Sequence, residues 1–362
     1  MTILLLVKNF DLGGTEVHVR ELANGLAKSG NKVIVLARKG RQEKYLHPKV
    51  TFLPHRFSNL RLPWSVKLIR SLITEKKIDI VHGHQRLPIL ASVIAGSCSK
   101  TPCVATIHGR IRLDARPSMI RRWIDRMIVV SPNRLTALSP ADPLRKRCRV
   151  IYNGLINSPQ PKARTCPNLV RILYASRIDS KHSLFLTSFL RHIWPKIRTT
   201  FPDAQFDILG DGEHLESVRE VAAPFLDPAQ PSVILHGFVP SLEPYLRKAS
   251  ITLGVGRVAI ESLALGVPVI PVNSAHQAPL VTRENYERLK ADNFVGRPFF
   301  TFSPNRLIDH LMKTLDNLPA SWDATSDLMT HVHEDFSLAR MITATQGVYR
   351  ELITSPTSRP AN

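Results

Sequence analysis

The feature that most constrains the fold of this chain is a repeated alternation between short apolar runs and longer segments of helical periodicity. Runs such as 3–7, 32–37 and 104–108 are rich in apolar residues and short enough to be buried strands. Segments such as 16–28 and 64–74 place apolar residues three or four positions apart, as on one face of a helix. Because strands that alternate with helices form parallel sheets, the sequence predicts an α/β chain.

A polar, proline-rich stretch divides this alternation into two series. The chain has 362 residues, which suits two domains better than one. Residues 158–168 contain three prolines and have the composition of a linker. We therefore predict two Rossmann-like domains, over 1–160 and 161–335, then a helix over 336–353 that can return to the first domain, and a loose tail over 354–362. The expected strands are 3–7, 32–37, 78–82, 104–108, 127–131, 149–152, 170–175, 205–209, 233–235, 251–253 and 269–271, and the other expected helices are 16–28, 64–74, 87–95, 184–198, 215–225, 258–265 and 305–315.

Positive charge is concentrated in the first of these series. Residues 1–160 carry 28 Lys and Arg against 9 Asp and Glu, a net charge of +19, whereas residues 161–362 carry 21 against 20, a net charge of +1. Such asymmetry predicts that the first half meets an anionic partner: a membrane surface, a phosphorylated acceptor or nucleic acid. A surface that merely aids solubility would show the same excess.

Cysteine usage and apolar patterning indicate the compartment. The four cysteines have neither a Cys-x-x-Cys pair nor the spacing of a zinc site, so reduced thiols are expected. The first residues lack a basic leader and a cleavage site, and no apolar run approaches the roughly 20 residues of a spanning helix. We expect a cytoplasmic protein, with peripheral contact to the inner face of the cell membrane as an option.

Several unusual residues of the first half follow its predicted strands, where ligands of parallel sheets bind. Gly13-Gly14-Thr15-Glu16 opens the first helix, and Gly14 would let a ligand approach the backbone, although a tight turn alone explains the glycines. His82, His84 and His108 end later strands. His108 is either a cleft residue or a structural histidine. His82 and His84 have no evident third ligand, so we expect no metal.

The second half carries two groups of residues suited to a nucleotide. Arg177 and Lys181 follow the first strand of this half, and two cations there would neutralise a diphosphate, although a solvated basic turn would look the same. Gly256, Arg257 and Val258 begin a helix that carries Glu261 one turn in. Its N–H groups can bind phosphate and Glu261 can accept from a ribose diol, or that carboxylate only complements the helix dipole. The chain contains no Asp-x-Asp motif, which fits a transferase that needs no metal.

Taken in order, these motifs resemble glycosyltransferase family 4, the retaining enzymes of GT-B fold. The resemblance covers nearly the whole chain and is carried by Gly13-Gly14-x-Glu16, Ile80-Val81-His82-x-His84, Val129-Val130-Ser131, Val150-Ile151-Tyr152-Asn153-Gly154, Arg177, Gly210-Asp211-Gly212, His236-Gly237-Phe238 and the run from Glu261 to Ile270. The stretch 254–261 with Asn293-Phe294-x-Gly296-Arg297 looks like a bacterial branch of the family.

The resemblance implies a reaction and a division of labour. Two Rossmann-like domains would face each other across a cleft, the second holding a nucleotide-sugar and the first an acceptor. Arg177 and Lys181 would contact phosphates, Glu261 the ribose and His108 the donor sugar, with Gly210, Gly256, Arg257 and Val258 at the donor and Gly14 against the diphosphate or acceptor. A hexosyl group would be transferred with retention, without metal or other cofactor, onto a glycan or lipid-linked acceptor such as a lipopolysaccharide precursor.

Three departures from the family pattern leave the donor sugar, base and acceptor unspecified. Leu253 stands where the family usually has the first glutamate of Glu-x₇-Glu. The family's basic residue usually falls five positions after the arginine, a place held here by His182, so Lys181, four positions after, is the predicted phosphate ligand. Asn273-Ser274-Ala275-His276 replaces the usual Pro-Glu.

The basic half suggests where acceptor or membrane would bind. Arg110, Arg121 and Arg122 belong to an arginine cluster beside apolar residues and Trp123, as in a helix that lies on a membrane. With Glu16 they are the predicted acceptor and membrane contacts. Two other functions remain alternatives: a nucleotide-sugar epimerase of the same fold, and a basic nucleic-acid-binding protein. The latter is disfavoured because aromatic residues, which would stack on bases, are only 7% of the chain.

Overall fold

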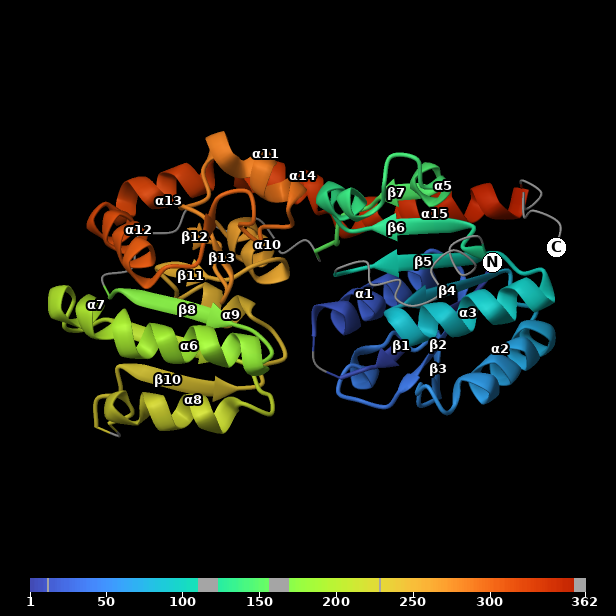
Figure 1. Ribbon diagram of the computed structural model, residues 1–362, viewed down its shortest axis with the longest axis horizontal. Coiled ribbons are helices and arrows are strands. Elements are labelled where there is room, and N and C mark those ends of the chain that lie inside the picture. The colour runs from blue at the N-terminus through green and yellow to red at the C-terminus, as the bar shows by residue number, and fades with distance from the viewer. Residues whose placement is uncertain (12, 110–122, 156–168, 228, 355–362) are drawn as a thin grey trace. The chain divides into compact units, whose positions relative to one another are not determined.

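The computed structural model describes residues 1–11, 13–109, 123–155, 169–227 and 229–354 (Figure 1). The chain divides into two compact units. The first comprises Met1–Ile156 together with Phe336–Asn362, and the second comprises Asn157–Asp335. The predicted linker prolines and nearly all of the predicted tail lie outside the described residues.

The first unit is built on a seven-stranded parallel sheet in the order β3-β2-β1-β4-β5-β6-β7. The interior strand β1 is buried on both faces, which is why residues 3–7 are an uninterrupted apolar run. The strands are β1 (Thr2–Asn9), β2 (Lys32–Arg38), β3 (Val50–Pro54), β4 (Ile80–His84), β5 (Cys103–Ile107), β6 (Arg126–Val129) and β7 (Cys148–Val150).

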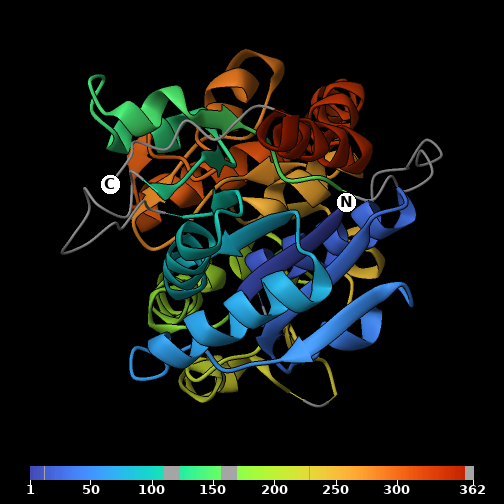
Figure 2. The same ribbon diagram turned by 90° about the vertical axis from the view of Figure 1, so that its right-hand side faces the viewer.

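Alternate side chains of β1 enter the two cores that sandwich this sheet. Ile3 and Leu5 pack with α1 (Gly14–Lys28) and the C-terminal helix α15 (Leu338–Thr354). Leu4 and Leu6 pack with α2 (Leu62–Lys76) and α3 (Arg86–Ser99) on the opposite face. The last helix, red in the figures, thus lies with the blue N-terminal elements (Figure 1, Figure 2). Short helical turns complete the unit: η1 (Glu43–Tyr45), η2 (Pro132–Ala137) and α5 (Pro143–Lys146).

The second unit has a five-stranded parallel sheet in the order β10-β9-β8-β11-β12 and a small antiparallel pair. Its core is rich in aromatic rings, among them Phe185, Phe189, Trp194 and Phe206. The elements are β8 (Arg171–Ala175), α6 (Ser180–His192), α7 (Trp194–Thr200), β9 (Gln205–Leu209), α8 (Leu215–Ala222), η3 (Ala223–Phe225), β10 (Val233–Gly237), α9 (Glu243–Leu246), β11 (Ile251–Leu253), α10 (Arg257–Ala264), β12 (Val269–Ile270), β13 (His276–Gln277), α11 (Arg283–Ala291), β14 (Phe300–Thr301), α12 (Pro304–Asp316), α13 (Leu318–Ser326) and α14 (Met329–Asp335).

The predicted α/β class with two Rossmann-like units is confirmed. The single helix expected over 184–198 is wrong: α6 ends at His192 and α7 begins at Trp194, because Pro195 cannot donate a helical hydrogen bond. The edge strand β3 was not expected, nor were α9, α11, α13 and α14, whose short or interrupted apolar patterns give little periodic signal. Among the described helices, none combines the length and apolar character needed to cross a membrane.

The contact between α1 and α15 can be tested at a glycine. A Cβ atom added to Gly25 would lie 1.7 Å from Cδ1 of Ile342, so the helices approach closely only because position 25 lacks a side chain. Gly25→Val should lower the free energy of unfolding by about 1–3 kcal/mol through overpacking, as measured by urea denaturation.

Two further variants distinguish this clash from a general effect on helices. Gly347→Ala, on α15, places its Cβ where nothing lies within 4 Å, and it should be neutral or slightly stabilising. Adding Ile342→Ala to Gly25→Val should recover part of the loss. Equal stability of Gly25→Val and the wild-type protein would contradict this packing.

Candidate active site

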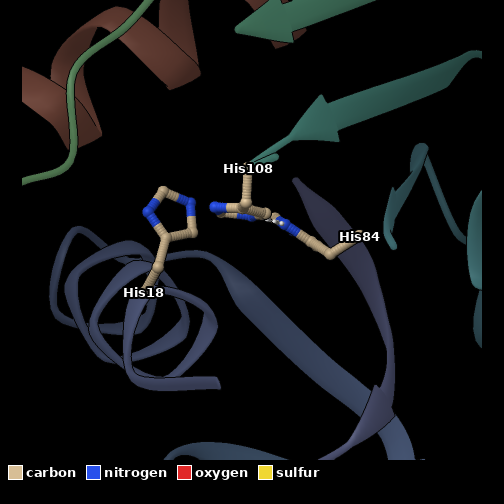
Figure 3. Close-up of side chains that lie close together, drawn as sticks. All are labelled: His18, His84 and His108. Atoms are coloured by element: carbon tan, nitrogen blue, oxygen red, sulfur yellow. Dashed lines mark hydrogen bonds between the residues drawn. The ribbon is translucent and has the colours of Figure 1, made fainter. Parts of the chain in front are cut away.

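Three histidines meet at the carboxyl edge of the first sheet. His84 is the last residue of β4, His108 directly follows β5, and His18 lies on α1, which follows β1. One ring nitrogen from each lies within 4.8 Å of the others (Figure 3). Because β1, β4 and β5 are adjacent parallel strands, their carboxyl ends bring these side chains together.

The rings of this histidine cluster, His18, His84 and His108, contact one another directly. Nδ1 of His84 lies 3.1 Å from Nε2 of His108, within hydrogen-bonding distance. The rings of His18 and His108 meet edge to face, 4.6 Å between centroids. His18 and His84 are buried, and His108 is partly exposed. Burial lowers the pKa of His108 to about 4 and holds that of His84 well below its usual value, so both rings are neutral near pH 7.

The unpaired nitrogen of His84 indicates which ring donates. Nε2 of His84 is buried and has no hydrogen-bond partner among the described residues. A buried N–H without an acceptor costs about 1–3 kcal/mol, and such groups are rarer than unpaired acceptors. The proton of His84 is therefore assigned to Nδ1, which donates to Nε2 of His108. In this arrangement His108 carries its own proton on Nδ1, as a neutral N–H donor.

His82 has a structural role that the sequence did not reveal. Its Nδ1 lies 2.6 Å from the hydroxyl of Tyr349 on α15, and its Nε2 lies 2.7 Å from the hydroxyl of Thr106 on β5. Burial, followed by the nearby His108, lowers its pKa to about 3. Both ring nitrogens are thus engaged, and the ring centroid packs 4.2 Å from that of His84. Through Tyr349, the C-terminal helix α15 thereby holds His82 in place against His84.

The cluster also bears on metal binding. The sequence paired His82 with His84 and found no third ligand, whereas the geometry groups His84 with His18 and His108. Imidazole nitrogen is a common ligand of zinc and other transition metals. All three described side chains are neutral imidazoles, a ligand set that catalytic zinc sites use with water in the fourth position. His18 was not predicted as part of this site because nothing in the sequence distinguishes it from any other histidine in the first turns of a helix.

The glycine turn before α1 is held by Glu16. Gly13 has φ 135°, and a Cβ there would lie 2.5 Å from Oε2 of Glu16. Oε1 of Glu16 accepts a hydrogen bond of 3.0 Å from the amide of Gln85, which links this turn to the start of α3. A Cβ on Gly14 would meet nothing within 4 Å, so this position is open. The other predicted acceptor or membrane contacts, Arg110, Arg121 and Arg122, lie outside the described residues.

In the second unit, Arg177 and Lys181 flank a capping carboxylate. Asp179 accepts hydrogen bonds from the backbone N–H of Lys181 and of His182, at 3.1 and 3.2 Å, and begins α6. Burial opposes ionisation of Asp179, but hydrogen bonds and charge from His182, with a hydrogen bond from Arg177, outweigh it and lower its pKa. The Arg177 side chain is 60% exposed, 3.4 Å from Asp179, and Lys181 is exposed. The connection therefore presents two cations to solvent.

Glycines let the loops at this sheet edge approach one another. Gly210 follows β9 with φ 139°, and a Cβ there would lie 1.8 Å from the carbonyl oxygen of Ser176, which follows β8. Gly256 precedes α10 with φ 59°, and its N–H donates to the carbonyl of Asn293 at 3.1 Å. Their backbone conformations favour glycine, so both have structural reasons to be there.

Glu261 is paired within its own helix. Nε of Arg257 donates to Oε1 of Glu261 at 2.5 Å, and the two side chains are 17% and 22% exposed. Val258 packs partly into the core beside them. Leu253, at the end of β11, is fully buried in the main core of the unit, so this position offers an apolar side chain where the family pattern has a carboxylate.

The strand order places the Arg177 connection and the Gly256 loop on either side of the point where the order of the second sheet reverses. β8 pairs with β11, and the connections from β8 and from β11 run in opposite directions across the sheet order β10-β9-β8-β11-β12. The Arg177 connection follows β8, and the loop that leads to Gly256 and α10 follows β11. In open parallel sheets a ligand binds where the order reverses, outside the carboxyl ends of these strands. The predicted donor residues of the second unit therefore share one edge of its sheet, whereas Gly14 and His108 belong to the first unit.

Family models match both units. The model "Glycosyltransferase Family 4" matches residues 12–156, and "Glycosyl transferases group 1" matches residues 170–295. The chain belongs to the family 4 glycosyltransferases. The enzyme class and the GT-B fold expected from the sequence are thus confirmed.

Related proteins agree with this assignment. An uncharacterized glycosyltransferase of Haemophilus influenzae is 23% identical over 93% of this chain and 96% of its own length. The phosphatidyl-myo-inositol mannosyltransferase of Mycolicibacterium smegmatis is 24% identical over 80% of this chain and 78% of its own. The solved structure of Anabaena Alr3699/HepE in complex with UDP and glucose has a TM-score of 0.72 at 16% identity, covering 97% of this chain and 100% of that one.

The neutral histidines of this glycosyltransferase make its stability depend on pH. The folded-state pKa of His108 is about 4, below the ordinary 6.5, so the unfolded chain binds more protons between these values. The free energy of unfolding should fall as pH is lowered from about 6.5 toward 4. His108→Asn should reduce this slope by about 1.4 kcal/mol per pH unit, as measured by urea denaturation at pH 5 and 6.

An exposed histidine serves as the control for this measurement. His192→Asn, at the end of α6, replaces a ring on the surface and should leave the slope as in the wild-type protein. If His108→Asn and the wild-type protein lose stability equally over this pH range, His108 is not held neutral by burial.

Proposed function

We propose that this glycosyltransferase transfers a hexosyl group, with retention and without a metal, from a nucleotide-sugar to a glycan or lipid-linked acceptor in bacterial surface glycan synthesis. The proposal that the second unit binds the nucleotide-sugar donor rests on one observation. The reversal of strand order between β8 and β11 is flanked by Arg177, Lys181, Gly256 and Glu261. The similar protein solved with UDP and glucose supports a nucleotide-sugar of this kind.

The donor diphosphate requires compensation of negative charge. Arg177 and Lys181 supply two exposed cations, and the first turn of α10 supplies backbone N–H groups of Arg257 and Val258. Glu261 would accept from the ribose diol, with Arg257 holding its carboxylate in place. These groups can stabilise the charge that develops on the leaving diphosphate, so we propose a reaction that needs no metal.

His108 would act as a neutral hydrogen-bond donor to the donor sugar. With a pKa of about 4, it carries too little charge near pH 7 to serve as a general acid. In same-face displacement, the bond from the anomeric carbon to the diphosphate breaks as the bond to the acceptor oxygen forms. The acceptor proton passes to the departing phosphate oxygen, so this scheme requires no basic side chain.

The acceptor would bind the first unit. Its excess of Lys and Arg, which includes Arg110, Arg121 and Arg122, suits an anionic or lipid-linked acceptor, with Gly14 and Glu16 near it. The similarity to a phosphatidyl-myo-inositol mannosyltransferase supports an acceptor of the lipid class. We propose that the enzyme works at the cytoplasmic face of the membrane, in synthesis of lipopolysaccharide or another surface polysaccharide.

Donor binding gives the direct test of this function. A screen of UDP-, GDP-, ADP- and CMP-sugars should find one that raises the thermal unfolding midpoint, because a ligand of the folded state stabilises it. Arg177→Ala or Lys181→Ala should weaken that donor about 10-fold or more in calorimetric titration, since each removes a charge-assisted contact of about 1.5–3 kcal/mol.

Matched controls separate a specific site from general electrostatics. Arg191→Ala and Lys196→Ala remove exposed cations elsewhere in the same unit and should leave the Kd unchanged. EDTA should not alter donor binding or transfer. Equal Kd values for all four variants would contradict the proposed site. Interconversion of the nucleotide-sugar without an acceptor would indicate an epimerase, and salt-sensitive binding to DNA without affinity for any nucleotide-sugar would indicate a nucleic-acid-binding protein.

A further inference from the structure

Two large apolar side chains protrude at the start of α2 in the first unit. Leu60 is 88% exposed and Trp64 is 69% exposed, the highest values among the large apolar side chains of the described residues. Leu60 lies in the turn before the helix and Trp64 in its first turn. Exposed apolar side chains that gather at one place usually mark a surface that binds something.

The chain on both sides of these residues is anchored, so their exposure is imposed by the fold. Phe57 is buried in the core beneath α2. The hydroxyl of Ser65 lies 2.8 Å from Nε2 of His55 and donates to the carbonyl of Arg61 at 2.9 Å. Ile69 continues the buried face of the helix. Leu60 and Trp64 cannot turn inward without breaking these contacts.

The charged residues near these two apolar side chains in the sequence are all basic. No acidic residue occurs from Val50 to Thr74. Four basic side chains of this stretch are exposed, and none of them forms an ion pair with a described acidic side chain. We define the α2 patch as Leu60 and Trp64 together with these four residues, Arg56, Arg61, Lys67 and Arg70.

We propose that the α2 patch docks the enzyme onto an anionic lipid bilayer. Tryptophan favours the interface between headgroups and acyl chains, where its ring is apolar and its N–H remains hydrated. Cations next to the surface are attracted to anionic headgroups, and together with an apolar insertion they give stable binding where either alone is weak. The inference rests on the proposed function in one respect, that a lipid-linked acceptor lies in that bilayer.

This surface differs from the one suggested by the arginine cluster around Arg121. It combines apolar and basic side chains that the fold holds in fixed places, and it uses a helix that the sequence marked only for its buried face. Among the described large apolar side chains, Leu184 comes next in exposure at 66%, and it lies on α6 in the second unit.

Vesicle binding by the full chain tests the proposal. The protein should float with vesicles of phosphatidylglycerol and phosphatidylcholine and not with phosphatidylcholine alone, and added salt should weaken the binding. Trp64 should shift its fluorescence to the blue on binding. Of the other three tryptophans, Trp194 and Trp322 are buried and Trp123 is half-buried, so Trp64→Phe should abolish the shift and Trp123→Phe should leave it.

Variants of the patch should lose this binding while they retain their fold. Lys67→Glu with Arg70→Glu should reduce the vesicle partition coefficient at least 10-fold, and Leu60→Ser with Trp64→Ser should reduce it to a similar degree. The matched control, Arg191→Glu with Lys196→Glu, makes the same change of charge in the second unit and should bind vesicles like the wild-type protein. All variants should keep the wild-type affinity for the nucleotide-sugar.

The outcomes distinguish this proposal from the proposed function. Unchanged vesicle binding by both patch variants would overturn the α2 patch, whatever the donor affinity. The proposal would also be overturned if the wild-type protein does not bind vesicles but binds single-stranded DNA or another protein, and if the patch variants lose that binding. The patch would then serve another partner. Vesicle binding that depends on the patch in a protein without affinity for any nucleotide-sugar would refute the proposed function and leave the docking surface standing.

Discussion

The carboxyl ends of parallel strands lie at one edge of a sheet, and the chemistry of this glycosyltransferase depends on that constraint. In the first unit it brings His84 and His108 together at the ends of β4 and β5. In the second it places the connections after β8 and β11 at the point where the strand order reverses. Residues far apart in the chain thereby become neighbours because the strands that carry them are adjacent. The strands need only be buried and parallel, which their apolar runs ensure.

Burial then sets the chemistry of each group of side chains. Burial lowers the pKa of His84 and His108 in the first unit and keeps both rings neutral, as hydrogen-bond donors and acceptors. The His82 ring between Tyr349 and Thr106 makes this packing depend on the C-terminal helix. Arg177 and Lys181 remain exposed and charged, as a diphosphate requires. Under the proposed function, the neutral histidines at the edge of the first sheet would suit a sugar, and the two exposed cations after β8 would suit a diphosphate.

The features that could be predicted from the sequence are those that a short run of neighbouring residues determines. Long apolar strands such as β1, the glycines before α1 and α10 and the arginine after β8 all carried a local signal. Partnerships between distant residues carried none: Tyr349 lies 267 positions from His82, and His18 looks like any helical histidine. The pairing of Arg257 with Glu261 spans only one helical turn, but either residue alone also suits a ligand contact. Short elements such as β3 and α9 were missed because their few residues establish no period.

A crystal structure of the enzyme with its nucleotide-sugar measures the central claim most directly. The account predicts diphosphate oxygens within hydrogen-bonding distance of the Arg177 guanidinium, the Lys181 ammonium and the first N–H groups of α10, with the ribose hydroxyls on Glu261. A nucleotide bound at another edge of the second sheet, or bound in the first unit while these three side chains point elsewhere, would contradict it.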